Sequence, residues 1–188
     1  CFNHASKLTG YAFILDACAE QPTAKCANFI GPDENAFNVD WVNRLSSIEK
    51  RIAQMQSTRL PVKPTAIWCN PPFDNKFEFI KECYRYSQLG LTIVMLIPFE
   101  RTSNWWRDLI TNKANRVFVP DGRYPFYEID GKTQKTGVNF ASCFVEEVTG
   151  SFADVKRDIS PFAWPMPRRN ERALSPRASL TWNLMAEA

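Results

Sequence analysis

The chain has 188 residues, of which 45% are hydrophobic and 23% charged, ordinary values for one soluble globular domain. This composition excludes a disordered protein, a collagen-like fibre and a coiled coil. No apolar run approaches the about 20 residues of a membrane-spanning helix. The net charge of +3 is weak support for a polyanionic partner. No signal peptide is visible, and the first residue is Cys1 instead of Met, so we expect that upstream residues were removed or lost.

The six cysteines form no C-x-x-C pair, and His4 is the single histidine. Protein zinc sites use closely spaced cysteine and histidine ligands, so this spacing argues against one and we expect no metal. Reduced, mostly buried thiols in a cytoplasmic protein are the better interpretation.

Short apolar runs alternate with helical patterns in the first part of the chain. Residues 13–15 predict a short buried strand that ends at Asp16. Asp40 is a natural N-cap for an amphipathic helix. The apolar positions of that helix are Val42, Leu45, Ile48, Ile52 and Met55. After a proline-rich connection, residues 65–69 predict a second strand.

The alternation continues through the middle of the chain. Residues 77–87 place apolar side chains on one helical face, and Gly90 suits the position after that helix. Residues 91–97 are almost wholly apolar, which is typical of a strand buried on both faces. Ser103 can cap a short helix, and residues 116–119 predict another strand. That helix would carry Trp105 and Trp106, one in the core and one at the surface.

Two further apolar segments, residues 124–129 and 140–148, predict antiparallel strands around a polar loop. Together the elements predict an α/β fold, with an open, mostly parallel sheet that ends in an antiparallel hairpin and has helices on both faces. Beyond Gly150 the periodicity fades. We therefore expect one domain over residues 1–150 and a C-terminal arm containing Pro and Arg over residues 151–188.

The most informative polar residues follow the strand at 65–69, in the run Asn70-Pro71-Pro72-Phe73. The two prolines restrict φ and remove two backbone donors, so the carbonyls of Asn70 and Pro71 can accept bonds from a ligand. These acceptors suit the two N–H groups of an exocyclic amine, and such bonds raise its nucleophilicity by drawing its lone pair out of ring conjugation. Phe73 offers a face on which a planar base can stack. The run favours methyl transfer to a nucleobase amine over a turn that merely ends a core strand.

Asn70-Pro71-Pro72-Phe73 has the form of the catalytic motif of amino-methyltransferases. From Gly10 to about Val148 the chain resembles the phage-type DNA adenine methyltransferases. The segments that carry the resemblance are Phe13–Ala19, Ala24–Cys26, Asp40-Trp41, Trp68–Phe73, Val94–Pro98, Arg101-Thr102, Trp105-Trp106 and Phe140–Ser142. The resemblance implies a Rossmann-like fold that uses S-adenosylmethionine to methylate the N6 amine of adenine at a specific site in double-stranded DNA, without a metal. It also implies a phage or prophage protein in the cytoplasm of a bacterial host, which would fit protection of viral DNA in restriction-modification.

The same resemblance assigns roles to individual residues. Asn70, Pro71, Pro72 and Phe73 would hold an adenine flipped out of the duplex. Asp16 would bind the ammonium group of the cofactor, and the alternative for Asp16 is a solvated loop aspartate. The other residues expected near the cofactor are Ala17, Cys18, Asp33, Glu34, Asn35 and Phe37.

Two of these cofactor assignments are open. Any of Asp33, Glu34 and Asn35 could accept bonds from the ribose hydroxyls. Phe37 packs either on the cofactor adenine or in the core. Asp40 is more often a helix cap than a ligand.

Several polar residues are candidates for contacts with nucleic acid. Arg101 and Thr102 follow the strand that ends at Pro98 and would lie beside the base pocket. The basic residues that would contact phosphate are Lys132 and Lys135 in the polar loop and Arg168 and Arg169 in the arm. A solvated charged surface is the alternative for these four residues.

The chain departs from the family pattern in two ways. Relatives carry an upstream segment around a Thr-Pro pair that helps to enclose the cofactor, and here either that segment was not included or the pocket is open. Phe73 stands where many relatives have Tyr, and the ring face used for stacking is retained. Three alternatives for the function are methylation of an RNA base, methylation of a protein glutamine, which uses the same four-residue motif, and a non-catalytic nucleic-acid-binding module on a degraded methyltransferase fold.

Overall fold

The computed structural model describes residues 1–55, 63–111, 113–120, 122–127, 133–136 and 140–148, and the backbone of residues 159–162. Its elements in chain order are α1 (Phe2–Thr9), β1 (Ala12–Asp16), α2 (Trp41–Met55), β2 (Thr65–Cys69), a 3-10 turn η1 (Phe73–Asn75), α3 (Lys76–Gln88), β3 (Ile93–Pro98), α4 (Asn104–Leu109), β4 (Arg116–Pro120), β5 (Ser142–Glu147) and β6 (Ile159–Phe162). None of the described helices is both long and apolar enough to cross a membrane.

The strands form one six-stranded sheet in the order β1-β2-β3-β5-β4-β6. Strands β1, β2 and β3 are parallel, and β5 runs antiparallel to both of its neighbours, β3 and β4. Since β5 is antiparallel to both β3 and β4, strand β4 runs in the same direction as β1, β2 and β3. The carboxyl ends of these four strands therefore lie at one edge of the sheet, as in a Rossmann-like methyltransferase fold.

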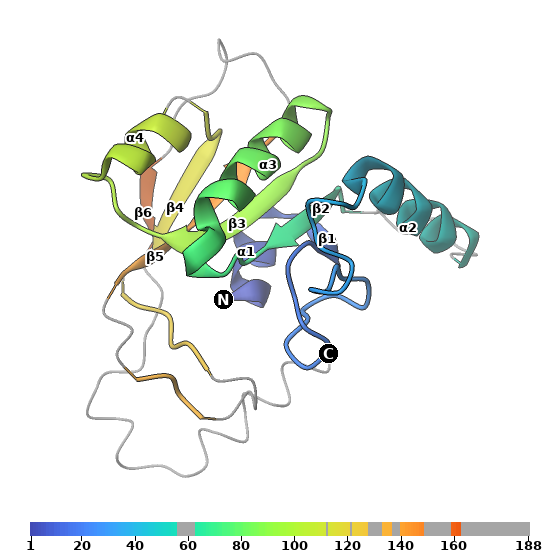
Figure 1. The fold of residues 1–188 in the computed structure, drawn as a ribbon, viewed down its shortest axis with the longest axis horizontal. Coiled ribbons are helices and arrows are strands. Elements are labelled where there is room, and N and C mark those ends of the chain that lie inside the picture. Colours follow the sequence, from blue (N-terminus) through green and yellow to red (C-terminus); the bar gives the residue numbers. More distant parts are fainter. Residues whose placement is uncertain are drawn as a thin grey trace.

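The sheet separates two apolar layers, because successive side chains of each strand point to opposite faces. On one face Ile67, Ile93 and Met95 pack with the buried sides of α2, α3 and α4. On the other face Trp68 and Val94 pack with α1. Figure 1 shows α3 and α4 in front of the sheet and α1 behind it. Every residue of β3 is buried, as the apolar run at 91–97 predicts.

The predicted helix starts are confirmed by hydrogen bonds. The backbone N–H of Asn43 donates to Asp40 Oδ1 over 3.0 Å at the start of α2. The backbone N–H of Trp106 donates to Ser103 Oγ over 3.3 Å at the start of α4. Trp106 is buried in the core as expected, whereas Trp105 is half-buried and packs against the core instead of lying at the surface.

The predicted pairing of residues 124–129 with 140–148 is wrong. The antiparallel partners of β5 are β3 and β4, and residues 124–127 form no strand apart from a single bridge between Tyr127 and Gln134. All six residues of β5 are buried, and its two edges are occupied by β3 and β4, so no edge is left for residues 124–127. The apolar pattern at 124–127 has another cause, since Tyr124 and Phe126 pack on the α1 face of the sheet.

Two elements were not expected from the sequence. Helix α1 is fixed by Ala5, which is fully buried, and by His4, whose Nδ1 lies 2.6 Å from the Tyr124 hydroxyl. Strand β6 pairs in parallel with β4, so the sheet continues past residue 150 into the segment that we assigned to the C-terminal arm. The rest of that arm lies outside the described residues, and its division from the domain stays a prediction.

Two adjacent glutamates are buried at the end of β5, and they differ in their partners. Glu146 Oε1 accepts bonds from the Tyr11 hydroxyl over 2.9 Å and from Arg116 Nη2 over 2.7 Å. Neither carboxyl oxygen of Glu147 has a hydrogen-bond partner among the described residues. Burial raises the pKa of Glu147 from 4.5 to about 8, against a smaller opposing effect of Lys113.

Replacement of Glu147 by Gln should remove a pH dependence of stability. Between pH 4.5 and about 8 the folded chain holds a proton on Glu147 that the unfolded chain releases. The free energy of unfolding should therefore fall as pH rises through this range, by at most about 1.4 kcal/mol per unit. Urea unfolding at pH 5 and pH 8 should show the fall in the unmodified protein and a smaller fall in Glu147→Gln.

Glu146→Gln is the matched control, because it removes a carboxylate that has partners. This variant should be less stable than the unmodified protein at pH 8, since the part-buried contact with Arg116 loses the negative charge of Glu146. Equal pH dependence in the unmodified protein and Glu147→Gln would show that the Glu147 carboxyl is hydrated or paired in solution.

Candidate active site

The loops that follow β1 and β2 meet at the carboxyl edge of the sheet. Asp16 lies in register with Trp68, and the N–H of Ala17 donates to the carbonyl of Trp68 over 2.8 Å. The polypeptide after β1 therefore leaves the sheet directly beside Asn70. In open α/β sheets, ligands bind at this edge.

The motif at the end of β2 is rigid at its base and presents Asn70 outward. Cys69 and Pro71 are buried, whereas Asn70 is exposed and makes no side-chain hydrogen bond to the described residues. Pro72 has φ −60° and ψ 137°, and its carbonyl accepts a bond of 3.1 Å from the N–H of Asn75. This bond closes η1, which leads without interruption into α3. The amide of Asn70 is thus free to meet a ligand.

Phe73 belongs to a cluster of three aromatic rings. Its centroid is 4.7 Å from that of Phe140, at an interplanar angle of 89°, and 5.8 Å from that of Phe126. Phe126 and Phe140 are themselves 5.8 Å apart, and all three side chains are partly exposed. We call Phe73, Phe126 and Phe140 the aromatic cluster.

Phe126 and Phe140 were not predicted as site residues, because the sequence pattern placed both in a hairpin. The topology brings them to the site, since β4 ends at the ligand edge and β5 begins there. The connection between these strands leaves from and returns to that edge, and in Figure 1 its described parts lie on the same side of the sheet as the loop after β1. The high aromatic content near residues 124–140 was the available signal.

Asp16 organises the loop that follows β1. Its Oδ1 accepts a bond of 3.3 Å from the N–H of Cys18, and its Oδ2 accepts one of 3.0 Å from the N–H of Lys25. Asp16 is only 2% exposed, so the alternative of a solvated loop aspartate is wrong. Burial raises its pKa to about 6, although the two backbone bonds oppose the rise. Ala17 is fully buried and Cys18 is half-buried.

A second segment lies beside β1 and carries the acidic candidates. Phe29 forms a parallel bridge with Asp16, and the N–H of Ile30 donates to the Asp16 carbonyl over 2.9 Å. Residues 33–35 follow this short pairing and so lie at the same edge of the sheet. The side chains of these three residues differ in whether they have an ion-pair or hydrogen-bond partner.

Glu34 forms an ion pair with Arg44, and Asn35 bonds its own loop by accepting from the N–H of Phe37 over 3.1 Å. Asn35 also has φ 54°, a left-handed conformation that asparagine tolerates well. Asp33 is exposed and has no side-chain partner among the described residues. Asp33 is therefore the carboxylate of this segment that is free for a ligand.

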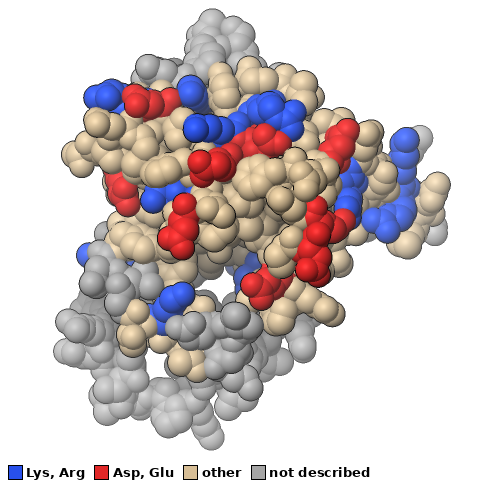
Figure 2. All heavy atoms as spheres, in the orientation of Figure 1, with Lys and Arg blue, Asp and Glu red and all other residues tan. Residues whose placement is uncertain are grey.

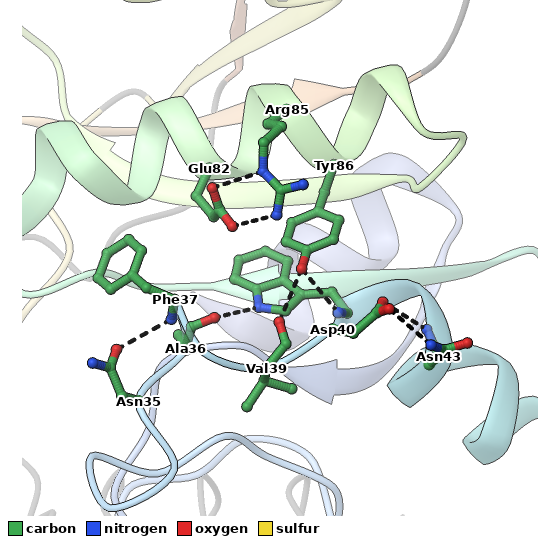
Figure 3. Close-up of polar contacts among 10 residues, drawn as sticks. Asn35, Ala36, Phe37, Val39, Asp40, Asn43, Glu82, Arg85 and Tyr86 are labelled. Atoms are coloured by element: carbon green, nitrogen blue, oxygen red, sulfur yellow. Dashed lines mark hydrogen bonds and ion pairs between the residues drawn. The ribbon is translucent and has the colours of Figure 1, made fainter.

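Phe37 is 42% exposed, so it does not belong to the core. One side of its ring packs on Phe79 of α3, with centroids 4.7 Å apart. Figure 3 shows Phe37 above the loop that carries Asn35 and Ala36. The exposed part of the ring offers apolar surface at the ligand edge.

The described candidates for nucleic-acid contact are exposed. Arg101 and Thr102 follow the end of β3, and Lys135 lies between Phe126 and Phe140 in the chain, where its N–H donates to the Phe126 carbonyl over 2.8 Å. Lys132, Arg168 and Arg169 lie outside the described residues. On the face in Figure 2, basic and acidic side chains of the described residues are interspersed, without an extended patch of one sign.

The cysteines of the described chain are all free. Cys69, Cys83 and Cys143 are buried, and burial raises the pKa of the Cys143 thiol well above its ordinary value. Among the described residues, no group of three or more His, Cys, Asp or Glu side chains could hold a metal ion. Cys69, Cys83 and Cys143 therefore act as small apolar core residues.

The model of the family described as DNA N-6-adenine-methyltransferase (Dam) matches residues 2–157, most of the chain. The chain belongs to this family. A curated relative, the DNA N-6-adenine-methyltransferase of Haemophilus phage HP1 (strain HP1c1), is 27% identical over 126 residues, which cover 66% of this chain and 61% of the relative. The chain thus matches less than two thirds of that protein's length. No solved structure matches significantly.

If Asp16 of this Dam-family protein holds the ammonium group of S-adenosylmethionine, Asp16→Ala should weaken binding of that cofactor by more than tenfold while the fold stays intact. A charge-assisted bond to an ammonium group contributes about 1.5–3 kcal/mol, and the variant also releases the N–H groups of Cys18 and Lys25. Because the pKa of Asp16 is about 6, affinity should also fall between pH 7 and pH 5 as the carboxylate is protonated. Titration calorimetry measures both effects.

Asp40→Ala serves as the control, since Asp40 is a second loop aspartate that accepts a backbone N–H. This variant should lose about 1 kcal/mol of stability through the helix cap and keep its cofactor affinity. Unchanged affinity in a folded Asp16→Ala protein would place the ammonium site elsewhere.

Proposed function

We propose that this protein transfers the methyl group of S-adenosylmethionine to the N6 amine of adenine at a specific site in double-stranded DNA. The observation that carries the proposal is the exposed Asn70 amide at the carboxyl end of β2, between the loop after β1 and the aromatic cluster, where it has no side-chain partner among the described residues. Membership of the Dam family supports the reaction class.

The motif suits an exocyclic amine as its target. The side-chain carbonyl of Asn70 and the backbone carbonyl of Pro71 supply two acceptors for two amine N–H groups. Both bonds draw the nitrogen lone pair away from ring conjugation and raise the nucleophilicity of the amine. Since Asn70 is exposed, water can take the proton that the amine loses.

The residues at the edge fit the chemical groups of S-adenosylmethionine. Asp16 suits the ammonium group, Asp33 is the free carboxylate for the ribose hydroxyls, and Phe37 offers an exposed ring for the adenine. When bound, the cofactor supplies an electrophilic methyl group on a sulfonium centre. The chain itself orients the amine, because such a transfer needs positioning more than a strong base.

The aromatic cluster favours a planar base over a glutamine side chain as substrate. Phe73 offers a stacking surface, and the rings of Phe126 and Phe140 stand at 73° and 89° to it, so the cluster presents aromatic surface in different orientations to a flat ring. In a duplex the adenine must leave the stack to reach these rings. Exposed Arg101, Thr102 and Lys135 are then placed to contact the DNA around it.

A tritium-transfer assay separates this function from its alternatives. The protein is incubated with S-adenosylmethionine labelled on the methyl group and with DNA, RNA or protein. Label in DNA that is recovered as N6-methyladenine supports the proposal. Label only in RNA or in glutamine identifies another amine substrate, and cofactor binding without transfer to any of them identifies a non-catalytic module.

Asn70→Ala should abolish transfer and leave cofactor affinity close to that of the unmodified protein. In this proposal Asn70 binds the target amine, and its side chain makes no hydrogen bond to the described residues that would stabilise the fold. Loss of one well-placed transition-state bond lowers rates by about 10²–10³, by analogy with oxyanion donors. Activity within threefold of the unmodified protein would exclude the role. Asn75→Ala is a control at the end of the same turn, and it should retain activity.

Phe73→Tyr should retain most activity, whereas Phe73→Ala should lose affinity for DNA whose target adenine is already unpaired. The tyrosine keeps the ring face, and a stacked base contributes about 1–3 kcal/mol. If Phe73 only fills the cluster, Phe73→Ala should instead lower the melting temperature, because truncation of a buried Phe costs about 3–5 kcal/mol. Melting and DNA affinity are measured on the same samples. A large melting loss with unchanged affinity would refute stacking.

A further inference from the structure

Tyr86 on α3 ties down the segment that precedes α2. Its hydroxyl donates to the carbonyl of Val39 over 2.9 Å and accepts from the N–H of Trp41 over 3.2 Å. Its ring stacks on that of Trp41, with centroids 4.7 Å apart and an interplanar angle of 8°. Tyr86 is 4% exposed, so both hydroxyl bonds are shielded from water. Figure 3 shows the hydroxyl pointing from α3 to this segment.

Arg85 holds the same ring from the surface of α3. Its guanidinium carbon lies 4.0 Å from the Tyr86 ring centroid. Its Nε and Nη2 donate to the two carboxyl oxygens of Glu82 over 2.9 and 2.5 Å. Glu82, Arg85 and Tyr86 all belong to α3. Their contacts therefore orient the tyrosine ring independently of the segment that precedes α2.

The segment held by Tyr86 is the one that presents Phe37. The indole N–H of Trp41 donates to the Ala36 carbonyl over 2.9 Å, so the residue directly before Phe37 is bound to the ring on which Tyr86 stacks. Phe79, the side chain beneath Phe37, lies seven residues before Tyr86, which is about two turns of the same helix. Helix α3 therefore supports Phe37 directly through Phe79 and indirectly through Tyr86 and Trp41.

We propose that Tyr86 is a positioning residue for S-adenosylmethionine, acting through the segment 35–41 to hold Phe37 in place for the cofactor adenine. The inference rests on the proposed cofactor site. Tyr86 itself is buried and does not touch the ligand. Its role is to order the segment before binding, which lowers the conformational cost of binding.

Tyr86→Phe tests this directly, because it keeps the stack on Trp41 and removes both hydroxyl bonds. Affinity for S-adenosylmethionine, measured by titration calorimetry well below the melting temperature, should fall about tenfold, a typical effect of about 1.4 kcal/mol. DNA affinity should not change. In the cofactor-free protein, amide hydrogen exchange of residues 35–41 should become faster, a readout that does not depend on activity.

Tyr124→Phe is the matched control on the other face of the sheet. It removes another buried tyrosine hydroxyl, which lies 2.6 Å from His4 Nδ1. This variant should lose stability to a similar degree and keep its cofactor affinity. A general loosening of the core would instead lower cofactor affinity in both variants.

A double-mutant cycle with Phe37→Ala shows whether Tyr86 acts through Phe37. If it does, the loss of cofactor affinity in Tyr86→Phe, Phe37→Ala should be smaller than the sum of the two single losses. Additive losses, unchanged affinity in Tyr86→Phe, or equal losses in Tyr86→Phe and Tyr124→Phe would each overturn the inference and leave the proposed function intact. Failure of the unmodified protein to bind S-adenosylmethionine would refute the proposed cofactor site, and the inference with it.

Discussion

The position of β5 is the constraint on which the rest of the molecule depends. It runs antiparallel between β3 and β4, with all six residues buried. This arrangement leaves β4 parallel to the first three strands, so that its carboxyl end reaches the ligand edge. The connection from β4 back to β5 then carries Phe126 and Phe140 to the ring of Phe73. The same burial of β5 encloses Glu146 and Glu147, and within the described part of the chain Glu146 has side-chain partners whereas Glu147 has none.

The candidate site is assembled from loops that are supported from opposite layers of the molecule. On the side proposed for the cofactor, Tyr86 of α3 holds the segment that presents Phe37. On the side proposed for the target base, Tyr124 is buried against α1 and bonded to His4, two residues before Phe126. In both cases a buried tyrosine hydroxyl fixes a loop that is otherwise at the surface. The sheet edge between them carries Asp16 and Asn70.

Most of the fold was predictable because its elements have strong local patterns. The strand at 65–69, the cap at Asp40 and the cap at Ser103 were all predicted correctly, since propensity and capping act over a few residues. The hairpin prediction failed for the opposite reason. An apolar alternation shows that side chains are buried, but it does not show which strand is the partner. Tyr124 and Phe126 pack on a sheet face, although residues 124–127 form no strand of the sheet.

The sequence by itself determined the motif Asn70-Pro71-Pro72-Phe73, its place after a buried strand, and the family to which the chain is related. These depend on residue types in order along the chain, which need no long-range contact to be recognised. Only the tertiary structure decided which acidic residue is free, because Glu34 is paired with Arg44 and Asp33 is not. It also decided that Phe126 and Phe140 join Phe73, since ring contacts between separate loops follow from strand order, which local pattern does not specify.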